Sequence, residues 1–107
     1  MPSAQDELFR TLADSTRRAL FERLCQEGAQ TVGELTAQSG VSQPAVSKHL
    51  ALLKHAGLVR GRHEGRHTRY SAEVKALAPL IGWAHQMTRF WNGRFDDLED
   101  LLKRMDQ

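Results

Sequence analysis

The sequence predicts a mainly α-helical domain that carries one small β-hairpin. Three observations indicate this fold class. Apolar residues recur at helical spacing over most of the first 56 residues. Two short basic stretches then flank a Glu-Gly pair, which is typical of a hairpin. Beyond residue 72 the helical spacing returns, so that a final helix is expected after the hairpin.

The size and composition of the chain predict a single domain, residues 1–107, around one modest core. No apolar run approaches the roughly 18 residues that a membrane-spanning helix requires. The first residues lack the basic and then apolar order of a signal peptide. A single cysteine, Cys25, cannot form an intramolecular disulfide, which favours a reducing compartment. We therefore expect a cytoplasmic protein that makes no membrane contact.

Two helices are expected before residue 30, and Asp14 is suited to cap the second of them. The pair Glu27-Gly28 is expected to end that helix. The apolar positions that define the two helices are Leu8, Phe9, Leu12, Leu20, Phe21 and Leu24.

A helix-turn-helix is predicted over residues 31–56. Thr31 and Glu34 have the spacing of a capping box, in which each side chain satisfies a free backbone N–H at a helix start. Gly40 is placed to close that helix in a left-handed conformation. The second helix is expected over residues 42–56, with Ser42 as its cap, Pro44 in its first turn and Gly57 beyond its end. Its inner face is expected to consist of Val46, Leu50 and Leu53.

Residues 58–71 are expected to form a two-stranded wing, with Gly65 free to adopt a positive φ at the turn. A long helix is expected over residues 78–106, beginning near Pro79 and interrupted by Gly93. Its apolar stripe is too long for the rest of the domain to cover, which favours a homodimer through this helix and residues 1–13. The residues expected at the dimer interface are Phe9, Leu80, Ala84, Met87, Trp91, Phe95 and Leu98.

The charge of the chain is concentrated in its middle. The formal net charge is only +2, yet residues 42–72 contain six Lys or Arg against one Glu, a local net charge of +5. Four of the five histidines lie in the same segment. A basic surface that coincides with a helix-turn-helix and its wing indicates binding to the phosphates of double-stranded DNA.

The outward face of the helix over residues 42–56 is the expected base reader, because a helix fits the major groove, which is roughly 12 Å wide. Gln43 can pair with adenine, and Ser47 can bond a base or a phosphate. In the wing, Arg62 and Arg66 are the favoured contacts, since alternation prevents all its basic residues from sharing a face. The full set of expected DNA-binding residues is Thr31, Ser42, Gln43, Pro44, Ser47, Lys48, His49, Arg62, Arg66, His67 and Arg69.

Four stretches together resemble the ArsR/SmtB repressors: residues 12–18 (LADSTRR), 31–35 (TVGEL), 41–50 (VSQPAVSKHL) and 53–59 (LKHAGLV). The resemblance spans about residues 8–71. It implies a dimeric winged helix-turn-helix repressor with four helices, the wing and a fifth helix. It also implies that the first and last helices form the dimer interface, and that the operator lies at or near the protein's own promoter. Such a dimer would favour an inverted-repeat operator.

The chain departs from the metal-sensing members of this family. Where those carry a thiolate pair in the third helix, this sequence has Val32-Gly33-Glu34. His85 is the single histidine of the last helix, and one imidazole is not a zinc site. We therefore expect no metal and no cofactor.

The sequence also bears on four other functions. No catalytic combination of side chains can be placed, so an enzyme is not expected. A winged helix used for protein–protein contact is opposed by the basic wing. A sensor of a small organic effector, bound between the terminal helices near Trp83, His85 and Trp91, remains open. A redox response through Cys25 also remains open, although a half-buried apolar role is favoured for this residue.

Overall fold

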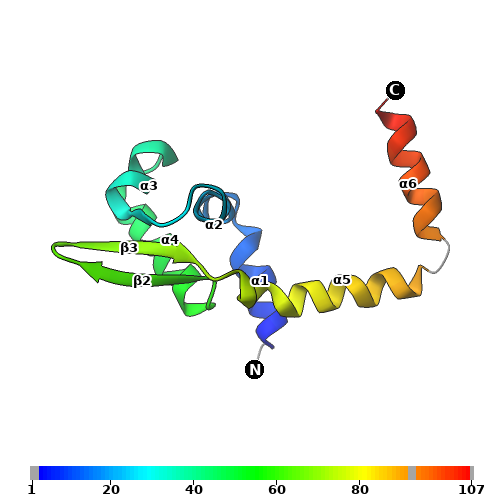
Figure 1. Ribbon diagram of the computed structural model, residues 1–107, viewed down its shortest axis with the longest axis horizontal. Coiled ribbons are helices and arrows are strands. Elements are labelled where there is room, and N and C mark those ends of the chain that lie inside the picture. The colour runs from blue at the N-terminus through cyan, green and yellow to red at the C-terminus, as the bar shows by residue number, and fades with distance from the viewer. Residues whose placement is uncertain (1–2, 92–93, 107) are drawn as a thin grey trace.

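The computed structural model describes residues 3–91 and 94–106, although the side chains of residues 94–96 lie outside this description. Helices dominate, and a small antiparallel sheet follows the helix-turn-helix, which confirms the predicted fold class (Figure 1). No helix in the described ranges is long and apolar enough to span a membrane. The elements are α1 (Ala4–Ala13), α2 (Ser15–Glu27), β1 (Gln30–Thr31), α3 (Val32–Ser39), α4 (Gln43–His55), β2 (Val59–Glu64), β3 (His67–Ala72), a 3-10 helix η1 (Val74–Leu77), α5 (Ala78–Phe90) and α6 (Arg94–Met105).

The helix boundaries follow from the side chains that cap them. The Asp14 carboxylate accepts the backbone N–H of Arg17 at 2.9 Å, as predicted for the cap of α2. Ser3 and Asp6 form a further capping box at the start of α1, which the sequence analysis did not identify. At the end of α2 the chain turns at Gly28, which has a φ of +85°.

The helix-turn-helix has the predicted caps at both of its helices. Thr31 and Glu34 form a complete capping box at the start of α3. Gly40 ends α3 in the left-handed conformation, with a φ of +76°. The Ser42 hydroxyl then accepts the N–H of Ala45 at 3.3 Å and starts α4. Local capping chemistry therefore sets the length of the turn between the two helices.

The sheet has three strands in the order β1-β3-β2, whereas the sequence predicted only the two strands of the wing. The additional strand β1 pairs Gln30 with Tyr70 and Thr31 with Arg69. Two residues are too few to display the alternation that identifies a strand in a sequence. Because β1 leads directly into α3, this pairing joins the wing to the start of the helix-turn-helix.

The core lies where α1, α2, α3, α4 and β2 meet, and it confirms the predicted inner face of α4. The tertiary arrangement is fixed by close packing of branched aliphatic side chains, since aliphatic residues make up most of this cluster. The buried apolar residues are Leu8, Leu20, Phe21, Leu24, Leu35, Val46, Leu50, Leu53, Leu58 and Val59.

The C-terminal region contains two helices, so the prediction of one helix over residues 78–106 was wrong in this respect. α5 ends at Phe90 and α6 begins at Arg94. In the sequence, Trp91 and Phe95 keep a helical spacing on either side of Gly93, which made the two helices look continuous despite that glycine. Asn92 and Gly93 have poor helix propensity, which favours an end to the helix here.

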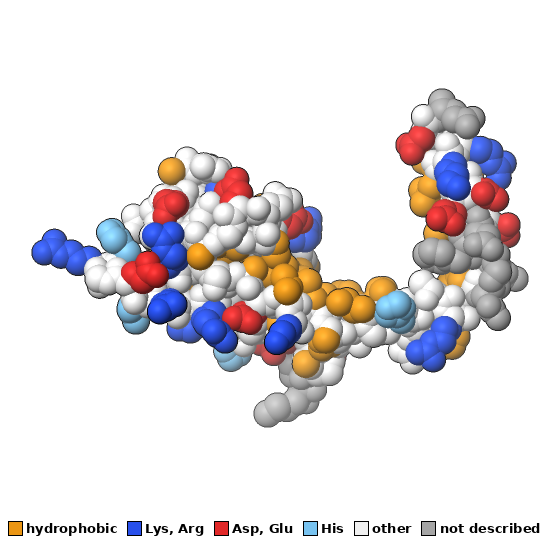
Figure 2. All heavy atoms as spheres, in the orientation of Figure 1, with side chains coloured by type: hydrophobic (Ala, Val, Ile, Leu, Met, Phe, Trp, Pro, Cys, Tyr) orange, Lys and Arg blue, Asp and Glu red, His pale blue; other side chains and the backbone are white. Residues whose placement is uncertain are grey.

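The molecule is extended because its C-terminal helices leave the core. The Cα radius of gyration is 17.0 Å, compared with about 13 Å for a compact chain of this length. Figure 1 shows α5 extending away from the helix-turn-helix and α6 turning away from its far end. In Figure 2 a continuous band of hydrophobic side chains runs from the core along α5.

Candidate nucleic-acid interface

The orientation of α4 is fixed by its buried face. Val46, Leu50 and Leu53 are completely buried against the rest of the core. The positions between them therefore face solvent near the N-terminal end of the helix. The side chains exposed there are Gln43, Pro44, Ser47 and Lys48, as the sequence predicted.

A surface hollow of about 410 Å³ lies between the start of α3, the start of α4 and the wing. Its walls come from three segments that are far apart in the sequence. It brings together four of the predicted DNA-binding residues: Thr31, Gln43, Arg66 and His67. The remaining lining residues are Val32, Gly33, Thr68 and Tyr70. The N-terminal end of α4 and the wing thus border one concave surface.

The two faces of the wing carry different chemistry. Gly61 pairs with Tyr70, and His63 pairs with Thr68, so these residues share one face, on which Thr68 and Tyr70 line the hollow. Arg62 pairs with Arg69 on the opposite face. Of the two favoured wing contacts, Arg66 lines the hollow and Arg62 does not.

Several of the expected contact residues already have intramolecular partners. The Thr31 hydroxyl donates to Glu34 Oε1 at 3.0 Å, and the Ser42 hydroxyl caps α4. The half-buried His49 ring lies against Arg17, with Nδ1 3.4 Å from Nη1 of that residue. These side chains hold the helix-turn-helix in shape as well as lying near its surface.

Arg69 is the most heavily engaged of the predicted residues. Its Nε donates to Glu64 Oε2 at 3.1 Å, and its Nη1 lies 3.7 Å from Glu34 Oε1. The same Nη1 donates to the backbone carbonyl of Ala29 at 3.4 Å. Hydrogen bonds from Thr31, with a smaller contribution from the Arg69 charge, hold the pKa of Glu34 below its ordinary value. The Glu34 carboxylate is therefore ionised at neutral pH.

Among the expected contact residues, the cationic side chains without an ion pair to a described residue lie on α4 and the wing. Lys48, Arg62 and Arg66 form no ion pair with any of the described residues. By contrast, Arg60 is paired with Glu73, with 3.1 Å between Nε and Oε1. Figure 2 shows Lys, Arg and His side chains gathered over the wing end of the molecule, away from the apolar band. These cationic side chains and the apolar band thus lie in different regions of the molecule.

Arginines of α2 hold the neighbouring helices, a role that the sequence analysis missed. Arg17 donates to the carbonyl of Thr11 at 2.6 Å, and Arg18 donates to that of Leu12 at 2.7 Å. Both carbonyls belong to the last turn of α1, which leaves them without a helical donor. The sequence contains a signal for this role, because Arg17 and Arg18 follow Asp14, the cap residue between the first two helices.

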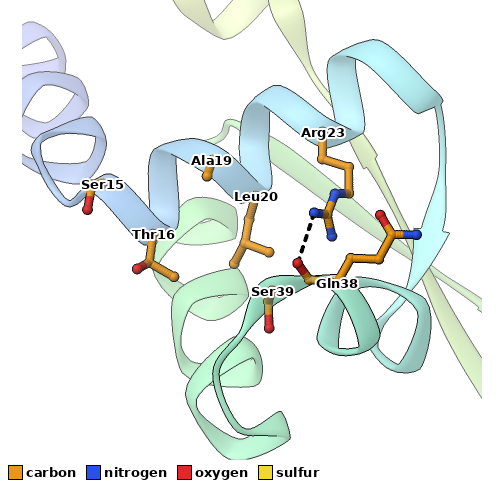
Figure 3. Close-up of a pocket in the computed structure, with 7 residues that line it drawn as sticks. All are labelled: Ser15, Thr16, Ala19, Leu20, Arg23, Gln38 and Ser39. Carbon is orange, nitrogen blue, oxygen red and sulfur yellow. Dashed lines mark hydrogen bonds between the residues drawn. The ribbon is translucent and has the colours of Figure 1, made fainter.

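Arg23 makes the corresponding contacts with α3. It donates to the carbonyls of Leu35 and Gln38 at 3.3 and 3.2 Å. Figure 3 shows its guanidinium reaching the end of α3 across a small hollow of about 220 Å³, which Thr16 and Ser39 also line. The position of the turn before α4 is therefore set from α2.

Cys25 does not have the half-buried position that the sequence favoured, because it is exposed on α2. Partial desolvation of the sulfur and, to a smaller extent, the charge of Glu22 raise the pKa of the thiol above its ordinary value of 9.0. A thiol with a raised pKa is mostly protonated at neutral pH and is a poor nucleophile.

Comparison with known proteins assigns these features to a family. A family described as a helix-turn-helix domain matches residues 12–62. The HTH-type transcriptional regulator Rv2034 of Mycobacterium tuberculosis is 44% identical over 86 residues, which cover 80% of this chain and 77% of that protein. A probable mercury resistance operon repressor of Streptomyces lividans is 38% identical over 80 residues, which cover 75% of this chain and 63% of that protein.

The fold also matches solved structures. The crystal structure of an ArsR family transcriptional regulator, RHA00566, superposes with a TM-score of 0.77 at 29% identity and covers 86% of this chain and 94% of that one. The predicted helix-turn-helix, the wing and the family resemblance all agree with these matches. The chain belongs to the ArsR/SmtB-like family of winged helix-turn-helix transcriptional repressors.

Proposed function

We propose that the protein is a homodimeric repressor that binds an inverted-repeat operator at or near its own promoter, without a metal effector and without catalytic activity. The observation that carries this proposal is the hollow shared by α3, α4 and the wing, which borders Gln43 and Arg66. Occupation of a promoter by such a dimer would exclude the polymerase. Binding to chromosomal DNA would place the protein in the cytoplasm.

The proposed base reader is the exposed N-terminal end of α4. Gln43 and Ser47 are one helical turn apart and both face solvent, so they can reach the same groove. A glutamine amide can form two hydrogen bonds with adenine, which gives it base preference. Lys48, Arg62 and Arg66 would bind phosphates, since their charges are not neutralised within the described part of the chain.

The proposed dimer interface consists of α5, α1 and α6. Exposed apolar residues are frequent there, and Ile81 and Phe90 expose 54% and 73% of their surface. Phe9 of α1 packs edge-on against Trp83 of α5 with 5.1 Å between ring centroids, so the two helices present a common surface. The expected residues Ala84, Trp91 and Leu98 are exposed, whereas Leu80 and Met87 are partly buried. The side chain of Phe95 lies outside the described residues.

The proposed independence of metals rests on the available donors. Residues 32–34 of α3 supply no thiol, and the sequence contains a single cysteine. Within residues 3–91 and 94–106, no three His, Cys, Asp or Glu side chains are grouped closely enough to hold a metal ion. A transition metal commonly requires three or four such ligands. The mercury resistance named for the relative from Streptomyces lividans is therefore not transferred to this chain.

Measurement of DNA binding by the purified protein tests the proposal. Selection from a random duplex library should yield an inverted repeat whose half-site centres are about 34 Å apart. Gln43→Ala should lose the preference at one base pair of each half-site, because it removes a base contact. Arg66→Ala should weaken all sequences alike and flatten the dependence of affinity on salt. Failure of the wild-type protein to bind any duplex at low ionic strength would refute the proposed function.

A further inference from the structure

Arg69 connects three separate segments of the chain. It lies in β3, the central strand of the sheet, and contacts Glu64 at the end of β2. It also contacts Glu34 in the first turn of α3 and the carbonyl of Ala29 before β1. Its side chain is 39% exposed, so the guanidinium is partly enclosed by these partners.

We propose that Arg69 is a positioning residue, which fixes the wing against the start of the helix-turn-helix so that both can engage DNA together. This inference rests on the proposed function, and it replaces the sequence-based expectation that Arg69 binds DNA directly. The two carboxylates that flank Arg69 neutralise its charge and would repel a phosphate. The guanidinium also has fixed donor directions, and its Nε and Nη1 are directed at protein acceptors.

Glu34 links Arg69 to the start of α3, where Thr31 lines the hollow. Its Oε1 accepts the backbone N–H and the hydroxyl of Thr31, at 3.2 and 3.0 Å, while it also faces Arg69. One carboxylate therefore serves both the cap of α3 and the wing. Thr31 and Arg69 are in addition backbone partners between β1 and β3. The separation of Gln43 from Arg66 across the hollow depends on this connection.

Arg62 provides a matched control, because it lies directly opposite Arg69 on the same face of the wing. Arg62 has no ion pair within the described part of the chain, so its charge is available to a phosphate. Removal of a phosphate contact lowers the slope of log affinity against log salt by about 0.9 for each contact. Loss of a positioning contact adds a free-energy cost for ordering the wing before the same phosphate contacts form, so it should lower affinity at every salt concentration and leave the slope unchanged.

The test measures operator binding by the full-length protein from low to high salt for Arg69→Ala, Arg69→Lys and Arg62→Ala. Arg69→Ala should weaken binding on the order of tenfold with the wild-type slope, whereas Arg62→Ala should flatten the slope. Arg69→Lys keeps the charge but loses the planar fork, so it should lose most of the same affinity. A flattened slope for Arg69→Ala, or wild-type affinity for Arg69→Lys, would overturn the inference.

Amide hydrogen exchange in the absence of DNA gives an independent measurement. Exchange at residues 64–68 should accelerate in Arg69→Ala and in Glu64→Gln, and it should remain at the wild-type rate in Arg62→Ala. Unchanged exchange in both Arg69→Ala and Glu64→Gln would contradict the proposed role. Because this readout needs no operator, it separates failure of the inference from failure of the proposed function.

Discussion

Two carboxylates at helix starts make the stability of the domain dependent on pH. The backbone N–H of Arg17 is the main cause that lowers the pKa of Asp14, and the backbone N–H of Thr31 is the main cause that lowers that of Glu34. Both groups are therefore more acidic in the folded protein than in the unfolded chain. A lowered pKa means that the ionised form stabilises the fold.

Replacement of Glu34 by Gln should expose this linkage. Above the ordinary pKa of about 4.5, the wild-type protein should have the larger free energy of unfolding by a constant amount. As pH falls through the lowered pKa of the folded state, that difference should disappear, because both proteins then carry a neutral group at this position. Urea unfolding at several pH values between neutral and acidic conditions measures it. A difference that increases on acidification would contradict the assignment.

At the scale of residues, most local contacts were predictable, the Ser3–Asp6 capping box being an exception, and distant contacts were not. Asp14, Thr31, Glu34 and Ser42 cap helices through partners three residues away, so spacing alone identified them. Arg69 meets a carbonyl 40 positions away, and no sequence spacing encodes that contact. The basic residues of the wing were recognised from the sequence. Only the structure shows that Arg69 is paired with carboxylates, whereas Arg62 and Arg66 have no ion pair among the described residues.

At the scale of elements, α3 and its C-cap contain two glycines with opposite requirements. Gly33 lies in the first turn of the helix, and an added Cβ would meet only Thr31 Oγ1 at 3.9 Å, which is an ordinary contact. Gly40 ends the same helix with a φ of +76°, a conformation that favours glycine over all other residues. The same substitution should therefore have opposite effects at the two positions.

Gly33→Ala should stabilise the protein by about 0.5–1 kcal/mol, because alanine has the better helix propensity. Gly40→Ala should destabilise it by about 1 kcal/mol, because the Cβ opposes the left-handed conformation. Chemical denaturation of the two variants beside the wild type measures both values. Destabilisation by Gly33→Ala comparable to that by Gly40→Ala would show that packing, and not backbone conformation, decides the outcome.

The elements themselves were largely predictable, because amphipathic spacing identifies helices longer than two turns. The helix-turn-helix and the wing have nearly the predicted bounds. The strand β1 was missed since its two residues are defined by their partner in β3 and not by their own pattern. The division between α5 and α6 was missed because apolar residues recur at helical spacing on both sides of Gly93, so that this glycine was taken as an interruption within one helix.

At the scale of the whole molecule, the fold leaves a large apolar surface beside a small core. The radius of gyration of 17.0 Å reflects helices that the single chain does not cover. Apolar residues of α5 and α6 are exposed, among them Ile81, Leu101 and Met105. A second copy would bury this surface with two-fold symmetry, which is the commonest arrangement in soluble oligomers.

The melting temperature should consequently rise with protein concentration, because association stabilises the folded state by mass action. Ala84→Glu places a charge on the proposed interface, so it should yield a monomer and remove this dependence. Gln86→Glu, two residues further along α5 and on another side of the helix, should retain both properties. Light scattering and thermal denaturation over a hundredfold range of concentration provide the measurements. A wild-type monomer at micromolar concentration would contradict the dimer.

The order of the strands has a consequence for solubility. With β3 in the centre, β2 is an outer strand, and its free backbone groups could pair with a strand of another molecule. Arg60, Arg62 and Glu64 occupy alternate positions along β2. Such charges disfavour edge-to-edge aggregation, since stacked copies would bring like charges together. Arg62, whose charge has no ion pair among the described residues, should thus also hinder concentrated protein from forming extended intermolecular sheets.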